Sequence, residues 1–192
     1  MRELRIHGRG GQGAVVASKV LAAALFREGK SVQSFPAFGV ERRGAPVTAF
    51  LRVSDGPILL RCEITEPDDV IILDPTLMKA VDVTQGLRPG GIILINSDRP
   101  AAHYADLAKT YRVSLVDASA IARALGLGSK TQPIVNTAIL GAFASDSGMV
   151  ALDSVCASIA EAVRVKTDKN VEAAREAARV VTRVGTTEVQ HA

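Results

Sequence analysis

The segment Leu4-Arg5-Ile6-His7-Gly8-Arg9-Gly10-Gly11-Gln12-Gly13-Ala14-Val15-Val16-Ala17 combines an apolar strand pattern, a cluster of glycines and the start of a helical pattern. This order is typical of the strand, loop and helix that open a Rossmann-like domain. Backbone N–H groups at the start of such a helix attract anions, because the helix dipole places positive charge there. The sequence therefore predicts an anion-binding loop made of Gly8, Gly10, Gly11, Gln12 and Gly13.

The rest of the chain alternates strand and helix patterns. Apolar runs predict strands at residues 31–35, 47–53, 58–60, 69–74, 92–95 and 112–116. Helical spacing predicts helices at residues 14–27, 76–85, 105–110, 118–125, 136–145 (with Asn136 as its cap), 152–163 and 170–184. We expect one α/β domain over residues 1–192, a Rossmann-like three-layer fold with a mostly parallel central sheet and a helical C-terminal part.

The amino-acid composition and charge argue against several classes of function. Apolar residues make up 47% of the 192 residues and the net charge is +3, with basic and acidic residues interspersed. Such a chain buries a substantial core and shows no basic patch for nucleic acid. Charged residues near the start argue against a signal peptide, and no apolar run is long enough to cross a membrane. Cys62 and Cys156 lack metal-ligand spacing, so we expect two reduced thiols and a cytoplasmic location.

Three interpretations of the glycine loop are open. The spacing of Gly8, Gly10 and Gly13 matches a dinucleotide site, but Gln33-Ser34-Phe35-Pro36 offers no carboxylate where such a site holds the ribose. A nucleotide P-loop is excluded, because Ala14 and Val15 stand where lysine and serine or threonine are required. An anion cradle for another ligand, and a purely structural role in strand–helix packing, both remain.

A second segment carries adjacent arginines between two prolines. Glu41-Arg42-Arg43-Gly44 lies within residues 36–46, next to Phe38. Arginine suits carboxylate and phosphate recognition, and arginine with aromatic side chains is enriched at protein interfaces. In an open α/β sheet this loop leaves the second strand at the same edge as the glycine loop. We therefore predict an interface formed by Phe38, Glu41, Arg42, Arg43 and Gly44.

The sequence offers no complete set of catalytic residues. His7 falls inside the first strand, where a core histidine is more common than a base. Asp74 ends a buried strand, where a cap or turn role is as good an explanation as a functional one. No hydrolase or metal-binding motif occurs. We expect no catalytic residue and no metal site in this chain, which would supply only part of a site.

With both loops considered, the chain resembles a known family. Gly8-Arg9-Gly10-Gly11-Gln12-Gly13 and the segment from Phe35 to Val47 are similar to the gamma subunit of 2-oxoacid:ferredoxin oxidoreductases. Glu66-Pro67-Asp68-Asp69-Val70 and Leu73-Asp74-Pro75-Thr76-Leu77 match the same family. The resemblance covers the chain from Met1 to about Gly148.

The resemblance implies a subunit of an enzyme that converts a 2-oxoacid and coenzyme A to acyl-CoA and carbon dioxide, with electrons passing to ferredoxin. It places thiamine diphosphate and Mg²⁺ on alpha and beta subunits, and iron–sulfur clusters on beta and ferredoxin-like delta subunits. This chain would hold no cofactor alone and would be inactive in isolation. The form of the arginine segment favours pyruvate, 2-oxoisovalerate or an aryl 2-oxoacid. The alternatives are a stand-alone nucleotide-binding oxidoreductase and a purely structural subunit.

Overall fold

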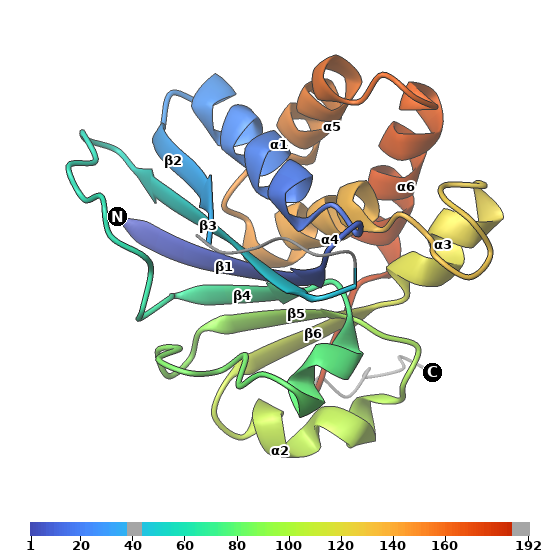
Figure 1. Cartoon of the computed structure of the whole chain (residues 1–192), viewed down its shortest axis with the longest axis horizontal. Coiled ribbons are helices and arrows are strands. Elements are labelled where there is room, and N and C mark those ends of the chain that lie inside the picture. The colour runs from blue at the N-terminus through green and yellow to red at the C-terminus, as the bar shows by residue number, and fades with distance from the viewer. Residues whose placement is uncertain (38–43, 186–192) are drawn as a thin grey trace, which may run out of the picture.

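A seven-stranded mixed sheet forms the centre of the computed structural model, which describes residues 1–37 and 44–185 (Figure 1). The strand order is β2-β3-β1-β4-β5-β6-β7. The strands are β1 (Arg2–Arg9), β2 (Ser31–Pro36), β3 (Pro46–Ser54), β4 (Asp69–Ile72), β5 (Ile92–Asn96), β6 (Arg112–Val116) and β7 (Thr182–Arg183). Strands β1, β4, β5 and β6 run parallel, whereas β3 and β7 are antiparallel to their neighbours. The prediction of a mostly parallel sheet is confirmed.

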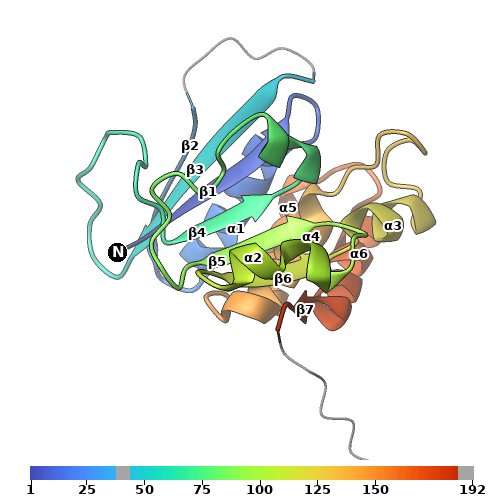
Figure 2. The same cartoon turned by 90° about the horizontal axis from the view of Figure 1, so that it is seen from below.

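Helices cover the two faces of the sheet unequally. The longer ones pack on one face: α1 (Ala14–Arg27), α3 (Ala118–Ala124), α4 (Asn136–Ser147), α5 (Leu152–Ala162) and α6 (Thr167–Val180). The other face carries short elements over β4 to β6: the 3-10 helices η1 (Pro75–Lys79) and η2 (Ala101–Tyr104), and α2 (Ala105–Ala108) (Figure 2). The three-layer fold with a helical C-terminal part is confirmed.

The alternation of β1 explains this arrangement. Leu4 and Ile6 point into the larger core under α1 and α4, while Arg5 and His7 point to the opposite face. Strands β4 and β5 are buried on both faces, as their continuous apolar sequences predict. The core therefore lies between the sheet and the long helices, with a smaller cluster under α2.

Four predictions about local structure are wrong. Residues 58–60 form no strand, because Leu59 and Leu60 lie in an exposed arm after Pro57. The helix predicted at 76–85 is only the short η1. The last helix begins at Thr167 and stops at Val180, because the chain turns there to pair β7 with β6. Asn136 is the first residue of α4, and its cap position is held by Val135.

The order in which strands are added to the sheet reverses beside β1. After β1 the chain builds β2 and β3 on one side, with β3 inserted between β1 and β2, and then crosses to build β4, β5 and β6 on the other side. Ligand sites in open α/β sheets form at this kind of switch point, outside the carboxyl ends of the strands. Among the described residues, no helix is long and apolar enough to cross a membrane.

Candidate functional site

A pocket of about 510 Å³ opens at the carboxyl ends of β1, β4 and β5. Its wall combines the glycine loop, the ends of three strands and the segments around α3 and before α4. The lining residues are Arg9, Gly10, Gly11, Gln12, Gly44, Leu73, Asp74, Pro75, Asn96, Ser119, Arg123, Thr131, Gln132, Pro133 and Val135. The pocket therefore lies at the switch point between β1 and β4.

Three of the five predicted glycine-loop residues face this pocket. Gly10, Gly11 and Gln12 line it, and Gly11 has φ +96° with open space where a side chain would stand. The Gly10 N–H donates to the Ala45 carbonyl at 2.9 Å, and the Gly44 N–H donates to the Gly10 carbonyl at 3.1 Å. These bonds hold the backbone of the loop against the start of β3.

The other two glycines serve packing. A Cβ on Gly13 would lie 2.5 Å from Asn136 Nδ2, and the residue has φ +82° just before α1. A Cβ on Gly8 would lie 3.1 Å from Leu73 Cδ1 and 3.2 Å from the Ala14 Cβ. The structural interpretation of the loop thus fits Gly8 and Gly13, while the backbone at Gly11 is open to a ligand.

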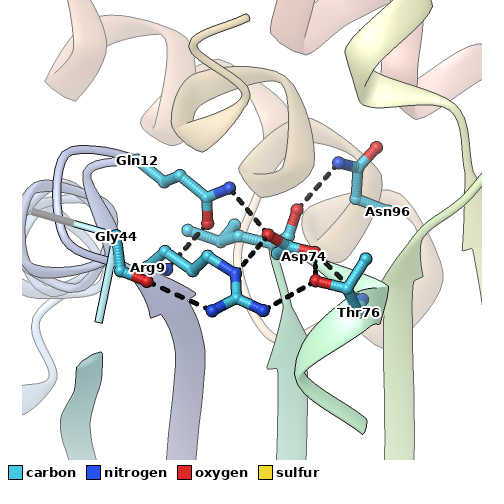
Figure 3. A network of polar contacts seen from close by, with 7 residues as sticks. Arg9, Gln12, Gly44, Asp74, Thr76 and Asn96 are labelled. Atoms are coloured by element: carbon cyan, nitrogen blue, oxygen red, sulfur yellow. Dashed lines mark hydrogen bonds and ion pairs between the residues drawn. The ribbon is translucent and has the colours of Figure 1, made fainter. Parts of the chain in front are cut away.

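A polar network centred on Asp74 forms the floor of the pocket (Figure 3). Arg9 Nε donates to Asp74 Oδ2 at 2.9 Å, and Gln12 Nε2 donates to the same oxygen at 3.2 Å. Thr76 donates to Asp74 Oδ1 from its backbone N–H at 2.9 Å and from its hydroxyl at 2.6 Å. Asp74 therefore caps η1 and also ties the glycine loop to β4.

Arg9 and Gln12 complete the network. Arg9 also donates to the Gly44 carbonyl at 3.1 Å and to Thr76 Oγ1 at 2.8 Å, and its backbone N–H donates to Gln12 Oε1 at 2.7 Å. Burial of the Asp74 carboxyl opposes its ionisation, but the hydrogen bonds from Thr76, Gln12 and Arg9 outweigh that effect and lower its pKa. The Asp74 charge is thus matched inside the floor by the Arg9 guanidinium.

The opposite wall presents amide, hydroxyl and guanidinium groups. Asn96, at the end of β5, donates to the Leu73 carbonyl at 2.8 Å and accepts from the Ser119 N–H at 3.1 Å. Arg123 follows one turn later on α3, is exposed, and has no carboxylate partner among residues 1–37 and 44–185. Because the charges of Arg9 and Asp74 cancel each other, Arg123 gives the pocket a net positive charge.

The predicted interface residues Phe38, Glu41, Arg42 and Arg43 lie outside the described residues. Gly44, the last residue of that segment, lines the pocket and bonds to both Gly10 and Arg9. The expectation that this loop leaves β2 at the same sheet edge as the glycine loop is confirmed, because β1 and β2 are both antiparallel to β3 and therefore end at the same edge. The interface itself stays a prediction.

Other titratable side chains lie outside the pocket. His7 is buried, and burial together with the nearby Arg5 charge lowers its pKa to about 4, so it is neutral. Asp117 caps α3 by accepting from the Ala120 N–H at 2.7 Å. Cys62 is exposed in the arm after β3, and Cys156 is buried in α5. The described part of the chain has no group of three or more histidine, cysteine or carboxylate side chains placed to hold a metal ion.

Comparison with known proteins assigns the chain to a family. A family model described as pyruvate ferredoxin/flavodoxin oxidoreductase matches residues 3–180, which is nearly the whole chain. The chain belongs to this family. The resemblance inferred from the two loops is confirmed.

Relatives within the pyruvate ferredoxin/flavodoxin oxidoreductase family share about half of their residues with this chain. The pyruvate/ketoisovalerate oxidoreductases common subunit gamma of Thermococcus kodakarensis is 51% identical over 181 residues, which is 92% of this chain and 95% of that protein. Pyruvate synthase subunit PorC of Methanocaldococcus jannaschii is 48% identical over 179 residues, with the same shares of the two chains.

Solved structures of the family share the fold. The crystal structure of pyruvate oxidoreductase subunit PORC from Thermotoga maritima has a TM-score of 0.79 and 33% identity, covering 95% of this chain and 97% of that one. The 2-oxoglutarate:ferredoxin oxidoreductase from Magnetococcus marinus, solved with 2-oxoglutarate, coenzyme A and succinyl-CoA, has a TM-score of 0.68 and 18% identity. This chain covers 31% of that longer one, and the likeness concerns the fold alone.

Reasoning from the sequence missed the wall opposite the glycine loop. Asn96 directly follows an apolar run, so its position at the carboxyl edge was predictable from the strand pattern. Ser119 and Arg123 belong to α3, whose position depends on packing against α4 and α6. No local sequence signal distinguishes Arg123 from the other exposed arginines.

Proposed function

We propose that this chain is the gamma subunit of a pyruvate-type 2-oxoacid:ferredoxin oxidoreductase. Membership of the pyruvate ferredoxin/flavodoxin oxidoreductase family supports the reaction class. Relatives at 51% and 48% identity, named as a common gamma subunit and as a pyruvate synthase subunit, support the subunit type and a substrate such as pyruvate or 2-oxoisovalerate. We place the complex in the cytoplasm.

Partner subunits supply the redox chemistry in this proposal. An iron–sulfur cluster is held by four thiolates, whereas this chain has two cysteines, one exposed in the arm after β3 and one buried under the opposite face of the sheet. The residues of this chain therefore do not fit a cluster. Thiamine diphosphate with Mg²⁺ on alpha and beta subunits would act as the electron sink for decarboxylation, and clusters on beta and delta subunits would pass electrons to ferredoxin.

The pocket at the switch point would hold a phosphate group of coenzyme A. The observation that carries this assignment is that the open Gly11 backbone and the Arg123 guanidinium line the same pocket, and that Arg123 has no carboxylate partner among the described residues. Arginine and backbone N–H groups are the usual donors to phosphate. Asp74 does not repel the anion strongly, because Arg9 and Gln12 already bind its carboxylate.

The chain's own residues would then bind and orient the co-substrate rather than transfer protons. Gln12 and Asn96 present amide groups, and Ser119 presents a hydroxyl, at the pocket wall. His7, a conceivable base, is buried in β1 and is not part of the pocket. The thiol end of coenzyme A would extend toward the partner subunits that hold the 2-oxoacid. The Phe38 and Glu41–Gly44 segment, whose last residue Gly44 lines the pocket, would pack against those subunits.

Co-expression with alpha, beta and delta subunits of the same organism tests the proposal. We expect the chain to co-purify with a thiamine-binding pair and a ferredoxin-like subunit, and the complex to reduce ferredoxin only when both pyruvate and coenzyme A are present. Replacing both Arg42 and Arg43 with Ala should weaken assembly. A chain that purifies alone from such cells, or a complex whose 2-oxoacid oxidation ignores coenzyme A, would contradict the proposal.

A further inference from the structure

Strand β2 lies at the outer edge of the sheet and is unusually unprotected. In the described part of the chain it pairs with β3 alone. Its sequence Ser-Val-Gln-Ser-Phe-Pro carries no charge, and every one of its residues is half-buried. Natural edge strands usually carry charges, bulges or covering loops that prevent pairing with other chains. By contrast, the opposite edge is closed by the two-residue β7, Thr182–Arg183, which is exposed and charged.

The alternation of hydrogen bonds between β2 and β3 shows which backbone groups of β2 are not bonded to β3. The Ala37 N–H donates to the Thr48 carbonyl at 2.8 Å, and these two residues continue the β2–β3 register. Antiparallel pairs alternate between bonded and non-bonded residues, so Val32 and Ser34 direct their N–H and C=O groups away from β3. Pro36, which has no N–H, occupies the next outward position. The edge thus offers two donors, from Val32 and Ser34, and three acceptors, from Val32, Ser34 and Pro36, to an incoming strand.

The two elements that bond to the side chains of β2, one on each face of the sheet, carry exposed apolar residues. On the helix side, the Ser34 hydroxyl bonds to that of Ser18 at 2.9 Å, which fixes α1 beside β2, and Phe26 of α1 is 69% exposed. On the other side, Gln33 Nε2 donates to the Leu60 carbonyl at 3.0 Å and holds the arm there. Leu59 in this arm is 87% exposed.

The charge on the helix side indicates what kind of partner fits. Arg27 is paired with Glu161 on α5, whereas Lys19 is exposed and has no carboxylate partner among the described residues. A second copy pairing antiparallel across β2 would keep both α1 helices on one face and bring two Lys19 side chains together. A segment of another protein with a carboxylate beside its apolar residues would instead pair with Lys19.

We propose that the free edge of β2 receives an extended segment of a partner subunit, which adds a strand to the sheet. The segment bonds to the backbone of Val32 and Ser34, places apolar side chains against Phe26 and Leu59, and presents a carboxylate to Lys19. This mode of recognition is strand addition to an exposed sheet edge. The inference rests on the proposed role of the chain as a subunit of a complex, and it assigns a contact surface separate from the Glu41–Gly44 segment.

The test uses the co-expressed complex and three charge substitutions at exposed apolar residues. Phe26→Glu and Leu59→Glu alter the β2 edge, and Val165→Glu is the matched control because Val165 is 73% exposed between α5 and α6. Recovery of the chain with the other subunits should fall about tenfold for the first two variants and stay unchanged for the control. Each isolated variant should melt at the temperature of the wild-type chain, because the replaced side chains are exposed.

Amide hydrogen exchange supplies a second measurement that does not depend on any variant. In the isolated chain the outward amides of Val32 and Ser34 should exchange quickly, and in the complex a peptide spanning residues 31–36 should gain protection. Normal assembly of the Phe26→Glu and Leu59→Glu variants, or equal exchange in the two states, would overturn the β2 proposal and leave the subunit assignment intact. A wild-type chain that dimerises through this edge would also overturn it. Failure of the wild-type chain to join any partner subunit would instead overturn the proposed function.

Discussion

Arg9 Nε lies 2.9 Å from Asp74 Oδ2, and this ion pair joins the carboxyl ends of β1 and β4 at the point where the sheet changes direction. The same Asp74 carboxylate accepts from Gln12 and Thr76, so the glycine loop, β4 and η1 share one anchor. The floor of the pocket is therefore preorganised before any ligand arrives.

Replacing Asp74 with Asn should weaken the hydrogen bonds that hold the glycine loop to β4 and η1, and should therefore lower the stability of the chain. The substitution removes the charge that Arg9 and Gln12 bind, and hydrogen bonds to a charged group contribute about 2 kcal/mol each to stability. We expect the free energy of unfolding, measured in urea at neutral pH, to fall by about 2 kcal/mol. Asp98→Asn is the matched control, because Asp98 is exposed and has no ion pair among the described residues. Equal losses in the two variants would show that the network adds no stability.

Gly13→Ala should be far more damaging than Gly29→Ala. Both glycines have positive φ, +82° and +80°, so both substitutions strain the backbone by about 1–2 kcal/mol. Only the Cβ at Gly13 meets another group, Asn136 Nδ2 at 2.5 Å. Thermal unfolding should show the larger loss for Gly13→Ala and partial recovery in the double variant with Asn136→Ala. Identical melting temperatures for the two glycine variants would contradict the close contact between α1 and α4.

His7 should make the chain less stable in mild acid. Its pKa is lowered from 6.5 to about 4 in the folded chain, so the unfolded chain binds more protons between these values. Stability therefore decreases as the pH falls from 6.5 toward 4, with a slope that approaches about 1.4 kcal/mol per pH unit. Urea unfolding across this range should show a shallower slope for His7→Gln. A slope unchanged by the substitution would mean that His7 is protonated in the folded chain.

Arg52 should be essential for the sheet face that lacks long helices. Its side chain is 1% exposed, donates to Glu3 Oε1 at 2.6 Å and to Gln33 Oε1 at 2.9 Å, and lies over the Phe35 ring. Arg52→Met leaves the Glu3 carboxylate without its partner, which costs about 3–5 kcal/mol. Adding Glu3→Gln should restore part of the stability lost, as measured by urea unfolding. A double variant less stable than Arg52→Met would show that Glu3 gains little from the pair.

The parts of the fold that follow from local patterns were predictable. Continuous apolar runs identify β4 and β5, and the glycine spacing identifies the turn into α1. The loop after β2 leaves the sheet at the edge where β1 ends, because these two strands run in the same direction. Gly44 meets Gly10 at that edge because the antiparallel β3 begins there. Asp74, interpreted as a cap or a functional group, is the cap of η1 and also the centre of the pocket floor.

The parts that depend on distant contacts were not predictable. The insertion of β3 between β1 and β2 is set by antiparallel pairing over the whole length of β3, which no local signal in Ser31–Pro36 reveals. Residues 58–60 are apolar as a strand would be, yet they form no strand, and Leu59 and Leu60 are exposed. The chain turn after Val180 depends on an ion pair between Arg183 and the nearly buried Asp146, 37 residues away in sequence.

The Michaelis constant for coenzyme A in the assembled complex tests the central claim most directly. Arg123→Ala should raise this constant about tenfold with kcat and assembly unchanged, because a lost contact to the phosphate weakens binding in the ground and transition states alike. Lys130→Ala is the control, since Lys130 is exposed nearby but does not line the pocket. A Michaelis constant for coenzyme A that is the same in wild type, Arg123→Ala and Lys130→Ala would contradict the claim that this pocket holds coenzyme A.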